Sequence, residues 1–161
     1  MSEWGDDMVL VAPAHDEYRT SEQVDLLFAA LAQAQGQVAG AIRDSTNPFF
    51  RSKYADLASV RAAMAVPFSA AALSYVQIPS SRPLAQPVAR TVKRGTEDRT
   101  VVDQFTEVSV RTIVAHASGQ WLQGVSRCVV ASADPQTVLA GWTYLRRGAL
   151  AAVAGVAPED D

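Results

Sequence analysis

The sequence predicts an α+β fold, and three observations support this class. Apolar residues recur with helical spacing in two stretches, 24–42 and 138–153. Between them, residues 108–130 contain two alternating runs around a glycine-bearing turn, the pattern of a β-hairpin. The chain has 161 residues, 48% of them apolar, which is enough for one domain with a buried core.

The first predicted helix begins at Thr20, because Thr20 and Gln23 have the spacing of a capping box. Its apolar stripe runs from Val24 to Ile42. Pro48 ends it, since the residue before a proline avoids the helical region.

A second helix and a strand are expected next, followed by an irregular segment. Asp56 is the predicted N-cap of the second helix, and Pro67 should break or restart it. A weak alternation predicts a strand over residues 73–78. Residues 79–106 hold three prolines, a glycine and mixed charges, which predicts a long loop that is either functional or mobile.

The last helix has clear signals at both ends. Asp134 and Pro135 suit the N-cap and first helical positions, and Gly155 suits the C-terminal stop. The element order is therefore helix, helix, strand, hairpin, helix. The buried face of the last helix is expected to consist of Val138, Trp142, Leu145, Ala149 and Val153.

Charge is unevenly distributed around a net charge of −3. Residues 1–34 hold seven acidic residues and one arginine, and residues 1–19 show no periodicity, so we expect a flexible acidic arm over 1–19 and a single domain over 20–161. Residues 43–111 hold ten basic and six acidic residues. This asymmetry permits a local anion-binding surface, although ordinary solvated charge explains it equally well.

The composition excludes several classes of protein. A lone cysteine, Cys128, excludes an intramolecular disulfide and a cysteine-based zinc site. No apolar run approaches the roughly 18 residues of a membrane span, and no secretory signal opens the chain, so we expect a soluble intracellular protein without membrane contact.

The sequence contains few motifs that are typical of enzymes. No phosphate-binding loop and no nucleophile elbow occur, which predicts a protein that is not an enzyme and uses no cofactor or metal. Asp103 and Glu107, four residues apart, leave a metal-dependent nuclease as an alternative.

Three groups of residues could bind nucleic acid. On the last helix, Thr143, Tyr144 and Arg147 share a polar side that suits a sugar-phosphate backbone with a stacked base, while Arg146 lies near the apolar boundary. An ordinary solvated helix face remains the alternative. The other groups are the segment 49–54, where Arg51, Lys53 and Tyr54 interleave bases with aromatics, and the expected loop, where Lys93 and Arg94 stand near acidic residues.

Three segments together resemble the ERF family of phage and prophage single-strand annealing proteins. Residues 47–60 resemble the family signature, residues 112–121 its central hairpin, and residues 136–150 its helix with a Thr-Tyr-x-Arg-Arg motif. The closing segment 155–161 also matches, and the resemblance extends over residues 20–78 and 106–161.

The resemblance implies a fold like that of the eukaryotic annealing mediators, a small antiparallel sheet of a strand plus a hairpin, backed by helices. It implies ATP-independent binding and annealing of single-stranded DNA in homologous recombination and repair, by a ring or filament of identical subunits in the cytoplasm of a bacterial host. Tyr144, Arg146 and Arg147 would line the DNA groove, with Arg51 and Lys53 near its wall. A phage exonuclease or a host single-strand binding protein is an expected partner.

The chain also departs from the family pattern. Leu139 stands where the family has glycine, and Gly148 where it has tyrosine. We expect the family's C-terminal region to be absent from this chain. A module that protects or delivers single strands without annealing them remains the closest alternative.

Overall fold

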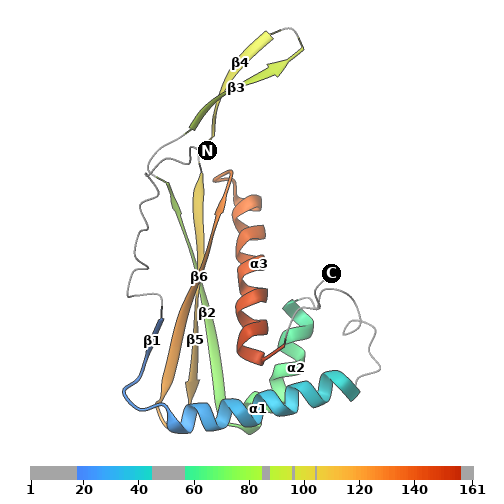
Figure 1. Ribbon diagram of the computed structural model, residues 1–161, viewed down its shortest axis with the longest axis vertical. Helices are drawn as coiled ribbons and strands as arrows, with labels where there is room; N and C mark the ends of the chain where they lie inside the picture. Colours follow the sequence, from blue (N-terminus) through green and yellow to red (C-terminus); the bar gives the residue numbers. More distant parts are fainter. Residues whose placement is uncertain (1–17, 45–56, 85–87, 96, 104, 157–161) are drawn as a thin grey trace, which may run out of the picture.

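The computed structural model describes residues 18–44, 57–84, 88–95, 97–103 and 105–156 (Figure 1). Helices and antiparallel strands confirm the predicted α+β class. In chain order the elements are β1 (Tyr18–Thr20), α1 (Asp25–Asp44), α2 (Leu57–Ala70), β2 (Leu73–Pro83), β3 (Val88–Arg94), β4 (Glu97–Asp103), β5 (Thr106–His116), β6 (Trp121–Val130) and α3 (Pro135–Ala154).

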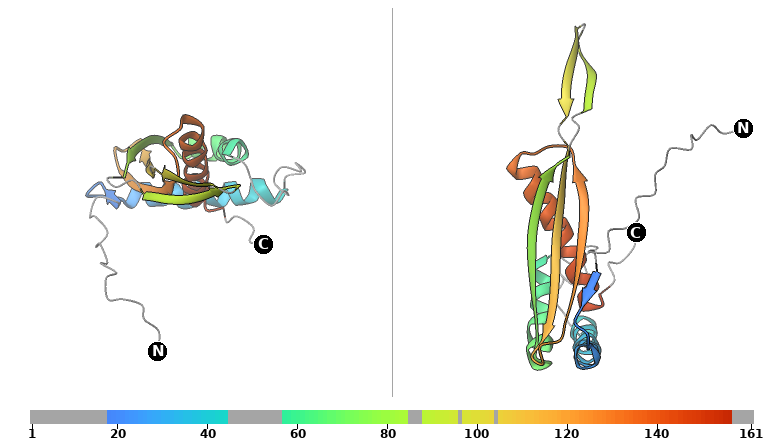
Figure 2. Two further views of the ribbon diagram at one scale, coloured as in Figure 1. Left: turned by 90° about the horizontal axis from the view of Figure 1, so that it is seen from above. Right: turned by 90° about the vertical axis from the view of Figure 1, so that its left-hand side faces the viewer.

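A four-stranded antiparallel sheet in the order β1-β6-β5-β2 forms the centre of the fold. The predicted strand and hairpin supply its three long strands. Helices α3 and α2 cover one face of this sheet, and α1 crosses the end of the strands (Figures 1 and 2). None of the helices in the described part of the chain is long and apolar enough to cross a membrane.

Strand β5 supplies the sheet's contribution to the core. Its residues alternate strictly, and Val108, Val110 and Val114 are fully buried toward the helices. Val114 packs with Leu27, Met64 and other residues of α1, α2 and the C-terminal half of α3. A second cluster, around Val108 and Val110, packs under the N-terminal half of α3. Helix α3 therefore lies along almost the whole length of β5.

The first helix starts later than the capping-box spacing predicts. Thr20 is the last residue of β1, where it pairs with Leu122 of β6. Because its backbone is part of the sheet, it cannot cap a helix. The Ser21 hydroxyl then donates to the Gln23 carbonyl at 2.6 Å, and α1 begins at Asp25. Because Tyr18 and Arg19 also belong to β1, the expected arm cannot extend to residue 19. The rest of that predicted arm lies outside the described residues.

The long loop predicted over residues 79–106 is wrong, since most of the described part is strand. Strand β2 continues to Pro83 and β5 begins at Thr106, while β3 and β4 form a separate two-stranded hairpin between them. Pro79 and Pro83 do not interrupt β2 because it is an edge strand, where a proline nitrogen can face away from the single partner strand. Figure 1 shows the β3–β4 hairpin projecting beyond the end of the sheet at which α3 begins.

The expected break at Pro67 is also wrong. Pro67 lies inside α2 and is buried, three residues before the helix ends at Ala70. A proline there lacks only the hydrogen bond to the preceding turn, and its carbonyl still accepts from the Ala71 N–H at 3.1 Å. The N-cap predicted at Asp56 lies outside the described residues.

Helix α3 has the ends that the sequence predicts. The Asp134 side chain accepts a hydrogen bond from the Thr137 N–H at 3.0 Å, and Pro135 follows it at the start of the helix. Gly155 ends the helix in the left-handed conformation with φ of 70°. Val138 and Leu145 are buried as predicted, whereas Trp142, Ala149 and Val153 are half-buried. The most deeply buried positions, Leu150 and Ala154, were not part of the predicted stripe.

The cap of α3 should give folding a measurable acid dependence. Hydrogen bonds from Thr137 and Ser132 lower the pKa of Asp134 from 3.8 to about 2. Because the folded-state pKa is depressed, the carboxylate stabilises the fold above about pH 4, and this contribution disappears as the pH falls toward 2. We expect Asp134→Asn, which caps without titrating, to melt below wild type at pH 5. Thermal denaturation followed by circular dichroism should show that difference shrinking at pH 2–3; a constant difference would contradict this assignment.

The turn between β5 and β6 caps the start of α1. Gly119 adopts φ of 89°, and the Nδ1 atom of His116 lies 2.9 Å from the Ser118 hydroxyl, so His116 anchors the turn. The turn places Gln120 in the interior, where its Oε1 accepts from the Leu27 N–H at 2.9 Å. Its amide nitrogen donates to the Asp25 carboxylate at 2.9 Å, which lowers the pKa of Asp25. One side chain thus serves the first turn of α1 as both acceptor and donor.

Substitution of Gln120 tests this cap. We expect Gln120→Ala to lower the free energy of unfolding by about 1–3 kcal/mol, because the Leu27 N–H loses its acceptor. Gln120→Glu keeps an acceptor but places a second carboxylate beside Asp25, so it should be less stable at pH 7 than at pH 5. Urea denaturation of both variants at the two pH values measures these effects. Equal stability of Gln120→Ala and wild type would show that the cap contributes nothing.

Candidate nucleic-acid interface

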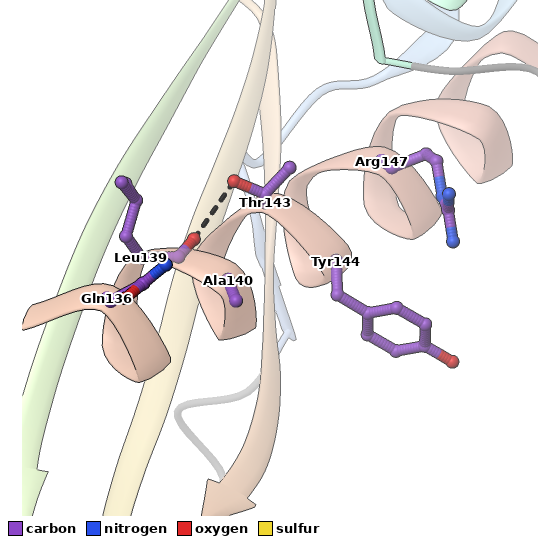
Figure 3. A pocket seen from close by; sticks show the side chains of 6 residues that line it. All are labelled: Gln136, Leu139, Ala140, Thr143, Tyr144 and Arg147. Atoms are coloured by element: carbon purple, nitrogen blue, oxygen red, sulfur yellow. Dashed lines mark hydrogen bonds between the residues drawn. The ribbon is translucent and has the colours of Figure 1, made fainter. Parts of the chain in front are cut away.

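Helix α3 presents a shallow groove on the side turned away from the sheet. Figure 3 shows the six residues that line the groove. They are spaced three or four positions apart along α3, which places them on one face of the helix. Tyr144 is 66% exposed, and the guanidinium carbon of Arg147 lies 5.6 Å from the centroid of its ring. The groove is lined by Gln136, Leu139, Ala140, Thr143, Tyr144 and Arg147.

The inner side of α3 fixes the orientation of this groove. Trp142 donates from its indole nitrogen to the Ser80 carbonyl of β2 at 2.8 Å. One residue earlier, Gly141 lets the helix approach β5 closely, since a Cβ atom there would lie 2.9 Å from a Val108 methyl carbon. Because Trp142 and Gly141 face the sheet, Thr143 and Tyr144 face solvent.

Arg146 lies at the boundary that its position in the helix predicts. Its Nε atom lies 3.4 Å from the Gln77 Oε1 atom of β2, and the Gln77 amide donates to the Arg146 carbonyl at 3.1 Å. The same amide lies 3.2 Å from the Thr112 hydroxyl. Gln77 therefore holds both the backbone and the side chain of Arg146 against the sheet.

The groove is cationic, and none of its six lining residues is acidic. No residue of α3 is acidic, and the helix carries Arg146 and Arg147. The Arg147 guanidinium lies against the face of the Tyr144 ring, and this cation–π contact orients the guanidinium without neutralising its charge. A phosphate beside Arg147 would lie next to the exposed ring of Tyr144. This pairing of a cation with an open aromatic surface suits a single-stranded nucleic acid.

The Thr143 hydroxyl is less available to a phosphate than its position on the outer face of α3 suggests. Its hydroxyl donates to the Leu139 carbonyl one turn earlier, at 2.9 Å. The hydroxyl can therefore accept a further hydrogen bond but cannot donate one to a phosphate oxygen in this conformation. Leu139, 59% exposed beside it, supplies an apolar edge to the groove.

The structure places Lys93 and Arg94 in the separate hairpin and not in this groove. Lys93 is exposed on β3 in the separate hairpin, where it pairs in register with Asp98, and Arg94 occupies the position opposite Glu97. Two consecutive register pairs of the hairpin thus place a basic residue opposite an acidic one. Arg51, Lys53 and Tyr54 lie outside the described residues.

Three groove residues were not among the predicted DNA-binding residues, namely Gln136, Leu139 and Ala140. Their signal was present in the sequence, because they precede Thr143, Tyr144 and Arg147 by three, four or seven residues on the same helix face. Extending the polar face toward the N-terminus of the helix would have found them.

Comparison with protein families settles the family of the chain. The profile of the ERF superfamily matches residues 27–161, from α1 to the last residue. The chain belongs to the ERF superfamily. This match confirms the resemblance noted in the three sequence segments and includes the whole of α3. No curated protein and no solved structure matches the chain significantly.

Membership of the ERF superfamily gives the general functional class. The superfamily is one of DNA-binding proteins that act in phage-type recombination by single-strand annealing. DNA is therefore the class of ligand that the family assigns to this chain.

Proposed function

We propose that this ERF protein binds single-stranded DNA along α3 and anneals complementary strands without ATP. The observation that carries the proposal is the pairing of Tyr144 with Arg147 on a helix that holds no acidic residue. The Arg147 guanidinium would bind a phosphate and the Tyr144 ring would stack on a base. Since neither contact reads the edge of a base, binding would tolerate any sequence and leave base edges available for pairing.

Assembly into a ring or filament would make these weak contacts effective. One groove can hold only a few nucleotides, and repeated copies on one strand raise the effective concentration of each. Within the described residues, β2 has a strand partner on one side only, so this edge of the sheet is available to a neighbouring subunit. Light scattering should show a homo-oligomer; a strict monomer with and without single-stranded DNA would exclude assembly.

The proposal involves no catalytic chemistry, cofactor or metal. Glu107, one of the two carboxylates considered for a nuclease, accepts hydrogen bonds from Arg82 at 2.9 and 3.3 Å, and these lower its pKa. Asp103 belongs to β4 in the other sheet. Among the described residues, no group of three or more His, Cys, Asp or Glu side chains could hold a metal ion.

Cellular context follows from the same proposal. An annealing protein of phage origin would act in the cytoplasm of a bacterial host, on single strands exposed by an exonuclease. That exonuclease or the host single-strand binding protein would be its protein partner.

A strand-annealing assay tests the function directly. Two complementary oligonucleotides carrying a donor and an acceptor fluorophore are mixed with the full chain in EDTA and without nucleotide. We expect pairing faster than the spontaneous rate. Binding without acceleration would instead identify a protecting or delivery module, and cleavage restored by a divalent cation but lost in Asp103→Ala would identify a nuclease.

A further inference from the structure

The face of the central sheet opposite α2 and α3 carries an apolar and basic surface that no described segment covers. Because β5 directs Val108, Val110 and Val114 toward the helices, its alternate residues and their register partners point to the other side. Figure 2 shows the strands in front of α2 and α3 from this side. We call this surface the open sheet face.

The apolar part of the open sheet face is unusually exposed. Val76 is 51% exposed, Ile78 is 48% exposed and Val129 is 56% exposed. Ile113, the register partner of Val76, and Val125, which lies across Arg111 from Ile78, are half-buried. Val76, Ile78 and Ile113 are neighbours on this face, and an exposed aliphatic patch of this kind marks an interaction surface.

The charged part of the same face is strongly basic. Arg111 is paired with Ile78 and Val125 in the register, and Arg19 on β1 lies opposite Gln123. Arg82 and Arg127 both approach Glu107, the only acidic residue at the strand positions of this face. Four arginines against one glutamate give the face a net charge of +3.

We propose that residues 1–17 of the same chain pack on the open sheet face. This segment holds five acidic residues and no lysine or arginine, which complements the charge of the face. It also holds Trp4 and the apolar run 8–11, which complement the exposed valines and isoleucine.

The attachment point and the length of the segment fit this arrangement. Residues 1–17 join β1 at Tyr18, and β1 is the edge strand of the sheet beside β6. Seventeen extended residues reach about 55 Å, whereas the distance from β1 across the sheet to β2 is about 14 Å. The segment can therefore cross the whole face.

The chemistry of the face favours this occupant over the alternatives. A second copy packing through the same face would bring two sets of arginines together. Nucleic acid would meet the aliphatic side chains of Val76, Ile78 and Ile113 beside the arginines, and these side chains offer neither charge nor a planar surface for stacking. Packing of residues 1–17 here would leave the α3 groove, on the other side of the sheet, open.

Fluorine NMR of the full chain labelled with 5-fluorotryptophan tests the proposal. Trp4→Phe assigns the Trp4 resonance, and its shift between H₂O and D₂O measures the exposure of the ring. We expect less than half of the isotope shift of the free amino acid. Arg111→Glu should raise the shift to the free value, whereas the matched charge reversal Arg61→Glu, on the exposed side of α2, should leave it unchanged.

A mixing experiment separates packing within one chain from exchange between chains. Labelled Arg111→Glu is mixed with an unlabelled chain carrying Asp6→Lys and Asp7→Lys, whose face is intact but whose own segment has lost two acidic groups. Trp4 should stay exposed; burial on mixing would show that the segment packs on a second copy and overturn the proposal.

An exposed Trp4 in the wild-type chain would also overturn it. The Arg111→Glu variant then identifies the occupant: weaker DNA binding would indicate nucleic acid, and loss of oligomer mass would indicate a second copy on this face.

Discussion

Replacing Tyr144 by alanine should weaken binding of single-stranded DNA by about 5- to 150-fold. Loss of a base–aromatic stack costs about 1–3 kcal/mol, and each 1.4 kcal/mol is a factor of ten in affinity. The ring is 66% exposed and makes its described ring contact with Arg147, so its removal should leave the fold intact. Tyr144→Phe keeps the aromatic face and should bind within about twofold of wild type.

Arg147→Ala should weaken binding of single-stranded DNA because fewer counterions are released when the strand binds. We expect the slope of log affinity against log salt to fall by about 0.7 on a single strand. Arg146→Ala should reduce DNA binding less, because Gln77 holds that side chain against β2, and part of its effect should appear as lower thermal stability.

Fluorescence anisotropy with a labelled oligonucleotide at several salt concentrations measures all three variants, and circular dichroism checks their folding. Equal salt slopes for wild type and a folded Arg147→Ala protein would show that this face of α3 does not contact phosphates. Sequence preference should not change in any variant, since backbone contacts do not read bases.

Gly141→Val should be the most damaging single substitution on α3. Even a Cβ atom at this position would lie 2.9 Å from one Val108 methyl carbon and 3.2 Å from a Val130 methyl carbon. Val108 is fully buried on a central strand, so neither the helix nor the strand can move without disturbing the core. We expect the free energy of unfolding to fall by about 3 kcal/mol, at the upper end for overpacked cores.

Gly148 on the same helix provides the matched control. It is exposed, and a Cβ atom there would have no neighbour within 4 Å, so Gly148→Val should change stability by less than about 0.5 kcal/mol. Adding Val108→Ala to Gly141→Val should recover part of the loss, because it removes the methyl groups that clash. Urea denaturation of the four chains measures these differences. A loss at Gly141 no larger than that at Gly148 would show that the contact with β5 does not limit the residue at position 141.

Local signals in the sequence predicted local structure well. Asp134, Pro135 and Gly155 each act through their own backbone or a neighbour within three residues, and all three were found at the ends of α3. The hairpin turn is equally local, because Gly119 supplies the positive φ that the turn requires. The helical period also placed Tyr144 on the outer side of α3.

Features that depend on distant partners could not be predicted in this way. Whether Pro79 and Pro83 interrupt a strand depends on whether that strand lies at an edge, which is a property of the whole sheet. Thr20 entered β1 because β6 offers it a partner about a hundred residues away along the chain. In the candidate site, the hold of Gln77 on Arg146 joins a strand to a helix 69 residues apart, and no spacing within either segment reveals it.

The Gln120 cap has a consequence for the order in which the chain folds. The hydrogen bond from the Leu27 N–H to the Gln120 side chain joins residues 93 positions apart. The first turn of α1 therefore lacks this acceptor until a residue that is synthesised much later is in place. On the ribosome, α1 emerges long before β5 and β6 and must remain incompletely capped until their hairpin closes. Formation of that hairpin is therefore the event that joins the beginning of the domain to its end, and a mutation in the turn should slow the docking of α1 more than the formation of α3.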